Sequence, residues 1–119
     1  MMKISNRIVK GTVVISIYGV IKKKDIEILL SKLHNYIDKG YRYFVIDLRH
    51  TRHSHYIFGY RLSEFKRRVD SLGGRLSLVL ASKYIMQILR LSGDDWTYSI
   101  SQNQKQALNV ILKFRRGNA

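Results

Sequence analysis

The sequence contains no cysteine, no proline and few acidic residues. Without cysteine the chain forms neither disulfide bonds nor thiolate metal sites, which favours a reducing compartment. No apolar run approaches the roughly 20 residues that a membrane-spanning helix needs. The first residues, MMKISNRIVKG, lack the apolar middle of a secretory signal peptide. These absences predict a cytoplasmic protein with no membrane span.

The scarcity of acidic residues leaves a large positive charge. Eight Asp and Glu stand against 22 Lys and Arg, so the formal net charge is +14 at pH 7. Such a surplus favours polyanionic partners: an acidic protein, a nucleic acid or an anionic membrane surface. The basic residues are dispersed, with KKK at 22–24 and RR at 67–68 and 115–116. This dispersion disfavours one dedicated nucleic-acid-binding arm.

The chain is long enough for one hydrophobic core. It has 119 residues, of which 45% are hydrophobic. It has no internal repeat, no low-complexity tract and no stretch rich in Pro, Gly or Ser, so we expect no linker. The sequence predicts a single domain over residues 1–119.

The first half of the chain alternates strand and helix patterns. The β-branched run 13–18 ends at Gly19 and predicts a strand, with a short strand at Ile8-Val9 before it and a turn at Lys10-Gly11. An apolar stripe with helical spacing predicts a helix over 25–39, ended by Gly40. Its members are Ile26, Leu29, Leu30, Leu33 and Ile37. The nearly all-apolar run 43–48 predicts a strand buried on both faces.

The second half continues the alternation. Phe58, Leu62, Phe65, Val69 and Leu72 share one face of a predicted helix over 56–71, which Gly73-Gly74 ends. We also expect strands over 76–81 and 97–100, a short helix over 83–91 and a last helix over 102–115. The residues of this last helix predicted to face inward are Ala107, Leu108, Ile111 and Phe114.

Strands that alternate with helices imply parallel pairing through right-handed crossovers. The predicted fold class is therefore α/β, with a mixed, mostly parallel sheet of four to five strands packed by about four helices.

The order of these elements resembles the STAS domain, the fold of bacterial anti-sigma factor antagonists. The resemblance covers roughly residues 8–112. Four stretches carry it: VVISIYGVI, YRYFVIDLRHT, SLGGRLSLVLAS and ILRLSGDDWTYSISQNQKQAL. The matching features are Gly19, Asp47-Leu48, Gly73-Gly74, Leu89-Arg90-Leu91-Ser92-Gly93 and Ala107-Leu108. The resemblance implies a STAS-like fold and binding of protein partners through the region that follows Asp47-Leu48.

The chain differs from this family at the motif that is phosphorylated in the antagonists. Antagonists have Asp-Ser-Ser-Gly at the start of the helix after the Asp-Leu strand. A partner kinase, which is also the anti-sigma factor, phosphorylates the second serine. At family spacing these positions fall on His55, Tyr56, Ile57 and Phe58. The phosphoacceptor position is therefore Ile57, which has no hydroxyl group, so the resemblance does not extend to the phosphoserine switch.

Three histidines in the stretch RHTRHSHYIFGY (49–60) raise the question of a metal site. His50, His53 and His55 are metal-ligand types, and Asp47 is close in sequence. The spacing is not an established one, and Arg49 and Arg52 would repel a cation. We therefore interpret the histidines as partly exposed residues of a loop and predict neither a metal nor another cofactor.

Catalysis is also disfavoured. General acid–base catalysis needs a group whose pKa is shifted toward the working pH and which lies beside a nucleophile or a substrate. Ser54 lies between two histidines in sequence, but neighbours on a loop seldom form a catalytic pair. The only acidic pair, Asp94-Asp95, follows Gly93 in a predicted turn. The sequence predicts no enzyme, and Trp96 is interpreted as a core or rim residue.

A protein-binding surface accounts for more of the residues in and after the histidine segment than a metal site or a catalytic site does. The exposed face of the second helix and the preceding loop bring tyrosines, arginines and histidines together, and Tyr and Arg are enriched at binding hot spots. Histidines would add a response to pH. The predicted partner-binding residues are Arg49, Arg52, His53, His55, Tyr56, Tyr60, Arg61, Glu64, Arg67 and Arg68.

The function predicted from sequence is a non-catalytic protein-interaction module in bacterial regulation. It resembles an anti-sigma factor antagonist that lacks the phosphorylatable serine. Its expected partner is an acidic protein surface, such as an anti-sigma factor kinase or another regulator. The alternatives are a basic nucleic-acid-binding protein and a STAS subunit of a transporter or a larger signalling assembly. Self-association into a homodimer stays open.

Overall fold

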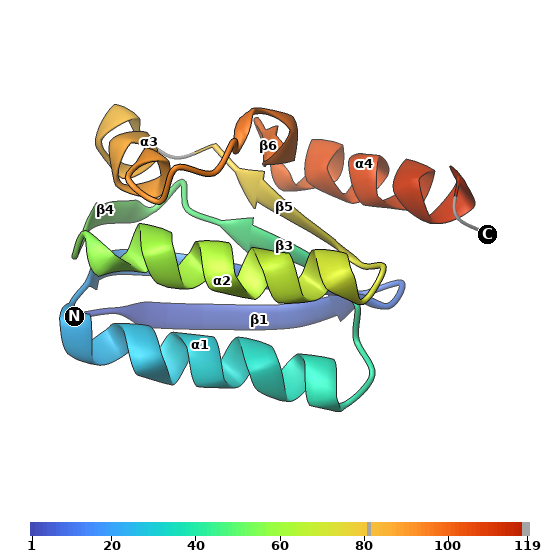
Figure 1. The fold of residues 1–119 in the computed structure, drawn as a ribbon, viewed down its shortest axis with the longest axis horizontal. Helices are drawn as coiled ribbons and strands as arrows, with labels where there is room; N and C mark the ends of the chain where they lie inside the picture. The colour runs from blue at the N-terminus through green and yellow to red at the C-terminus, as the bar shows by residue number, and fades with distance from the viewer. Residues whose placement is uncertain (81, 118–119) are drawn as a thin grey trace.

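The computed structural model describes residues 1–80 and 82–117, which form a mixed sheet flanked by helices on both faces (Figure 1). The strands are β1 (Lys3–Val9), β2 (Thr12–Ile21), β3 (Tyr43–Asp47), β4 (Thr51–Ser54), β5 (Arg75–Val79) and β6 (Ile100–Ser101). The helices are α1 (Lys23–Asp38), α2 (Ile57–Ser71), α3 (Lys83–Arg90) and α4 (Gln104–Gly117), with a 3₁₀ turn at Thr97–Ser99.

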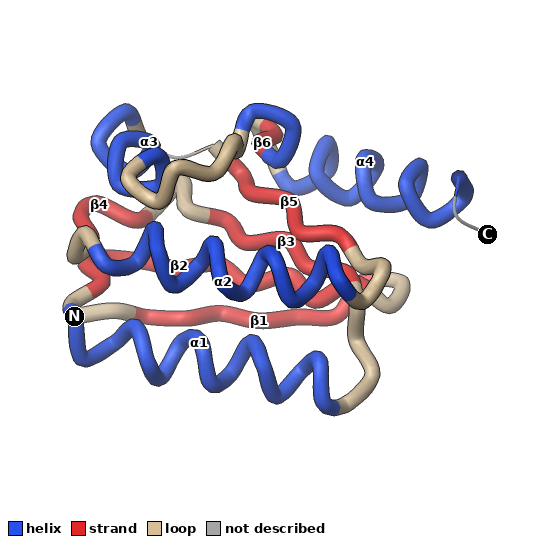
Figure 2. The backbone as a smooth tube through the Cα atoms, viewed as in Figure 1, coloured by secondary structure: helices blue, strands red, loops and turns tan. Residues whose placement is uncertain are grey.

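The sheet is organised around the long strand β2. Its order is β1-β2-β3-β5-β6, and β4 pairs with β2 beyond the end of β3. Only β1 is antiparallel, joined to β2 through Lys10-Gly11, whose φ angles of 49° and 79° suit a two-residue hairpin. All other pairs are parallel. Figure 2 shows the strands as one layer behind α1 and α2.

Two cores hold the layers together. The larger core packs the sheet against α1, α2 and α3 and includes Phe44, Phe58, Phe65 and the fully buried Trp96. The smaller core joins Val14, Val45 and Val79 on the other face of the sheet to α4 through Ala107 and Ile111. Because both faces are covered, the central strands are mostly apolar, with Ser16, Asp47 and Ser77 as buried polar residues.

The predicted fold class is confirmed, and most of the predicted apolar helix faces are buried in the structure. All five stripe residues of the first helix are buried in α1. In α2 the face from Phe58 to Val69 is buried, but Leu72 is 43% exposed because the helix ends before it. In α4 only Ala107 and Ile111 are fully buried, while Leu108 and Phe114 are half-buried. Ala81, the last residue of the predicted strand 76–81, lies outside the described residues.

Two predicted segments differ from the structure. The strand expected over 97–100 is a 3₁₀ turn followed by the two-residue strand β6, since the buried Trp96 donates to the carbonyl of Leu89 and Asp95 caps Thr97. The histidine segment was expected to be a loop, but residues Thr51–Ser54 form β4. The described residues consequently form a sheet of six strands, where four to five were predicted.

Candidate protein-interaction site

The strand β4 determines how the histidine segment is presented. The chain turns at 48–50, where Gly19 N–H donates to the His50 carbonyl, and β4 then runs parallel to the end of β2. The pairing shifts register after Thr51, so the side chains do not alternate regularly: Thr51 and Ser54 are buried, while Arg52 and His53 are exposed. The Thr51 hydroxyl donates to the Ile17 carbonyl at 2.9 Å and fixes the start of the strand. Residues 51–54 of the predicted loop therefore belong to the sheet.

Each histidine of the segment stacks on a different tyrosine. His50 lies against Tyr18 of β2, His53 against Tyr84 of α3, and His55 against its neighbour Tyr56, with ring centroids 5.0, 4.8 and 4.5 Å apart. The three imidazoles are therefore held apart. Within residues 1–80 and 82–117, no group of three or more metal-type side chains is close enough to hold a metal ion.

The start of α2 lies directly after His55. The backbone N–H of Ile57 donates to Nδ1 of His55 at 3.1 Å, and the N–H of Phe58 donates to the His55 carbonyl. His55 thus takes the place of a side-chain cap for the first turn of α2. Ile57 is half-buried and lies beside a hollow of about 620 Å³ that Lys23, Lys24 and Arg61 also line.

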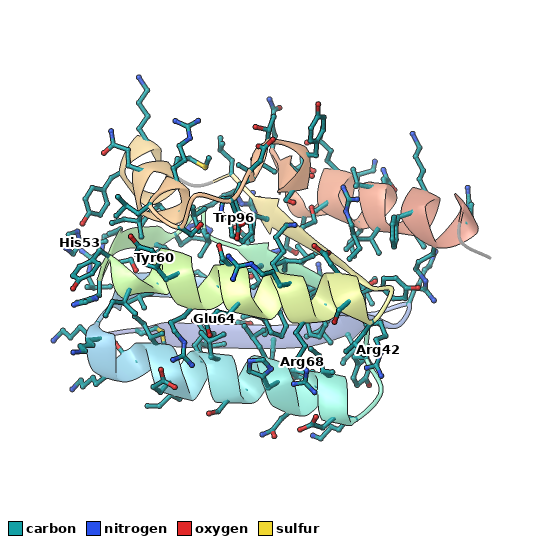
Figure 3. All side chains as sticks on the ribbon, viewed as in Figure 1. Arg42, His53, Tyr60, Glu64, Arg68 and Trp96 are labelled. Atoms are coloured by element: carbon teal, nitrogen blue, oxygen red, sulfur yellow. The ribbon has the colours of Figure 1, made fainter. Side chains whose placement is uncertain are left out.

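The predicted partner-binding residues divide into two groups along α2. Figure 3 shows His53 at the end of the sheet beside α3, Tyr60 near the start of α2 and Arg68 toward its other end. The first group, called the β4–α2 surface below, consists of Arg52, His53, His55, Tyr56 and Tyr60. Tyr56 and Tyr60 are 55% and 44% exposed. Tyr84, at 40% exposed, joins this surface through its stack on His53.

The second group is held in ion pairs within the molecule. Arg61 bridges Glu27 of α1 at 2.9 Å and lies 3.9 Å from Glu64. Arg67 pairs with Asp94 and Arg68 with Asp38. These pairs join α1, α2 and the 91–96 loop, and they neutralise much of the positive charge that the sequence placed on α2. Asp94 is therefore an ion-pair partner rather than a freely solvated turn residue.

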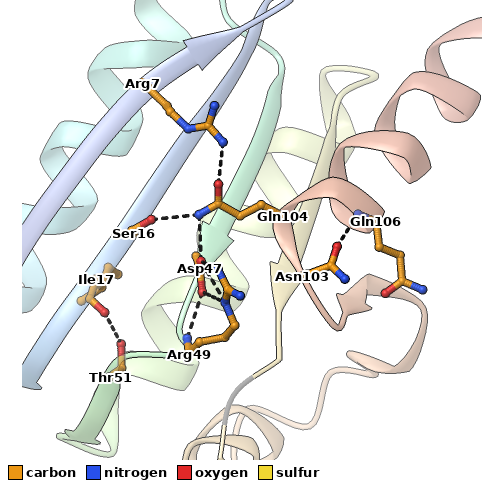
Figure 4. Close-up of polar contacts among 9 residues, drawn as sticks. All are labelled: Arg7, Ser16, Ile17, Asp47, Arg49, Thr51, Asn103, Gln104 and Gln106. Carbon is orange, nitrogen blue, oxygen red and sulfur yellow. Dashed lines mark hydrogen bonds and ion pairs between the residues drawn. The ribbon is translucent and has the colours of Figure 1, made fainter.

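Arg49 is also committed to an internal contact (Figure 4). It makes a bidentate ion pair with the buried carboxylate of Asp47, and the shortest of these contacts is 2.8 Å. Gln104 of α4 donates to the same carboxylate at 2.8 Å. Burial alone would raise the pKa of Asp47, but the hydrogen bonds from Arg49 and Gln104 outweigh it and lower the pKa below 3.8. Gln104 therefore joins α4 to β3, and Arg49 is held against the end of β3.

Sequence reasoning missed the tyrosines that orient the histidines. Tyr18 and Tyr84 lie in a strand and a helix far from the histidine segment in sequence, and no local pattern links them to it. Gln104 was missed for the same reason, because a lone glutamine at a helix start gives no sign of the carboxylate that it meets.

Comparison with solved structures shows a STAS-like fold. A protein from Thermotoga maritima assigned as an anti-sigma factor antagonist superposes with a TM-score of 0.82 at 15% identity, over 92% of this chain and 94% of that one. An anti-sigma factor antagonist from Mycobacterium paratuberculosis gives 0.80 at 17% identity, over 94% and 95%. The Bacillus cell-fate determinant SpoIIAA, in its phosphorylated form, gives 0.74 at 16% identity, over 93% and 99%.

No protein-family model and no curated protein matches the sequence. Within the described residues, no helix is long and apolar enough to cross a membrane.

Proposed function

We propose that this chain is a non-catalytic protein-interaction module of bacterial regulation, related in its action to anti-sigma factor antagonists. One observation carries the proposal. The fold is similar to that of a solved antagonist structure over more than nine-tenths of the chain. In this fold, α2 begins at Ile57 beside an exposed surface of tyrosine, histidine and arginine. The chain acts in the cytoplasm, and its domain spans residues 1–119.

The β4–α2 surface has the composition of a protein-binding hot spot. Tyr56, Tyr60 and Tyr84 expose large, rigid rings that bury much apolar area at low entropic cost. Arg52 is an exposed residue of β4 and, within the described part of the chain, makes no ion pair. A partner surface with acidic residues around an apolar centre would complement this arrangement.

The partner binds without phosphorylation of this chain. Ile57 has no hydroxyl group, and the adjoining hollow is lined by Lys23, Lys24 and Arg61 against the single carboxylate of Glu27, so its net charge is positive. A carboxylate of the partner would be favoured there, because both the cations and the N-terminus of α2 attract negative charge. Binding is therefore constitutive or is regulated on the partner's side.

Matched variants test the location of this surface. The tagged chain would be used to capture protein from its native cells, and the recovered partner would then be purified for a direct affinity measurement. Tyr56→Ala and Arg52→Glu should each weaken binding about tenfold or more, as hot-spot changes do. Tyr98→Ala and Lys113→Glu are the matched controls, since both residues are exposed and lie outside the β4–α2 surface. Equal losses in the test and control variants would refute the proposed surface.

Nucleic acid is the second candidate, favoured by the net charge of +14 and by the exposed tyrosine rings of the β4–α2 surface. It predicts tight binding of a single-stranded oligonucleotide whose affinity falls steeply with salt. The internal pairing of Arg61, Arg67 and Arg68 reduces the cationic surface available on α2 and favours the protein partner.

A further inference from the structure

A second surface lies on the other side of the sheet, between the β1–β2 hairpin and α4. A groove of about 290 Å³ runs between them. We propose that this groove binds an acidic amphipathic peptide segment of a partner protein. The site is separate from the β4–α2 surface, because α4 covers the face of the sheet opposite α1 and α2.

The floor of the groove is aliphatic. Val9 of β1 and Leu108 and Leu112 of α4 line it, and all three side chains are half-buried. Val9 and Leu108 also pack on the smaller core, which holds the floor in place. Two or three apolar side chains of an incoming helix would fit such a floor at i, i+3 or i+4 spacing.

The rim of the groove is cationic. Arg7, Lys10 and Lys105 line it. Neither the sequence of β1 and β2 nor that of α4 contains an acidic residue. Arg7 donates to Oε1 of Gln104 at 2.6 Å, while Nε2 of Gln104 donates to Asp47, whose carboxylate is buried beneath it (Figure 4). The exposed charge around the apolar floor is therefore of one sign, which selects an anionic partner.

The same geometry favours a peptide over a nucleic acid. Base stacking needs an open aromatic face. The ring of Tyr43 on this side of the sheet is covered by the guanidinium of Arg115, 4.6 Å from its centroid, and Arg115 also donates to the Lys10 carbonyl. Arg75 lies in the same way over Phe114, at 5.3 Å. An aliphatic floor with a cationic rim instead complements leucine and glutamate on one helical segment.

The test uses the full chain and a fluorescent synthetic helix with leucine at every third or fourth position and glutamate elsewhere. Fluorescence anisotropy should show saturable binding, and a peptide of the same composition in scrambled order should bind much more weakly. The double variant Lys10→Glu/Lys105→Glu should weaken binding about tenfold, whereas Lys83→Glu/Arg90→Glu on α3, on the opposite face of the sheet, should change it less than about twofold at physiological salt. Leu112→Gln should also weaken binding, since it removes part of the floor.

Several results would overturn the proposal. These are equal losses in the two charge-reversed doubles, equal binding of the scrambled peptide, and no effect of Leu112→Gln. Displacement of the peptide from the groove by an oligothymidine or by anionic vesicles at lower concentration would assign the groove to those partners instead. A concentration-dependent dimer that Leu112→Gln dissolves would assign it to a second copy of the chain.

Discussion

At the residue scale, His34 makes the stability of the fold depend on pH. Its ring lies edge-on to Phe65, and Nδ1 lies 2.7 Å from Arg68. Burial is the largest cause that lowers the pKa of His34 below 6.5, followed by the charge of Arg68. Arg61 acts in the same direction, and the carboxylates of Asp38 and Glu64 act against it. The folded chain therefore prefers the neutral imidazole.

The sign of the effect follows from this preference. Because the unfolded chain binds the proton more readily, the free energy of unfolding is greatest at pH values above 6.5 and falls as the pH drops through this value toward the lowered pKa. We expect the urea midpoint to be lower at about pH 5.5 than at about pH 7.5. In His34→Gln, which cannot titrate, this difference should shrink. An unchanged difference would assign it to another group.

At the element scale, Gly59 determines how closely α2 approaches α3. A Cβ atom added at this position would lie 2.1 Å from the carbonyl oxygen of Ile88. Gly59→Ala should therefore lower the free energy of unfolding by about 1–3 kcal/mol through overpacking, despite the higher helix propensity of alanine. Gly117→Ala in α4 is the control, because no atom of the described residues lies within 4 Å of its added Cβ. Denaturant titration of both variants measures the difference, and equal stabilities would contradict the packing argument.

The elements also show what the sequence could predict. Buried strands and amphipathic helices have apolar periodicity, so β2, β3, α1 and most of α2 were predicted within a few residues. The strand β4 has no such pattern, since TRHS joins β2 through its backbone and only Thr51 and Ser54 turn inward. A polar strand of this length is specified by tertiary pairing rather than by local sequence.

At the scale of the whole molecule, the charge is unevenly distributed, which composition could not reveal. Among the described residues, six of the eight acidic residues are in ion pairs; five of these six pairs include a residue of α2, and the sixth is that of the buried Asp47 with Arg49. The predicted site residues consequently separated into an exposed β4–α2 surface and a set of arginines that stabilise the fold. Such a division depends on which helices pack together, and it cannot be predicted from local sequence patterns.

The most direct test of the central claim is a site-specific crosslink in living cells. A photo-crosslinking phenylalanine analogue would replace Tyr60 in one chain and Tyr98 in another, both exposed tyrosines in the wild type. The analogue at position 60 should join the chain to one discrete protein partner, and the analogue at position 98 should not. Crosslinks of the same pattern from both positions, or crosslinks from position 60 to nucleic acid alone, would contradict the claim.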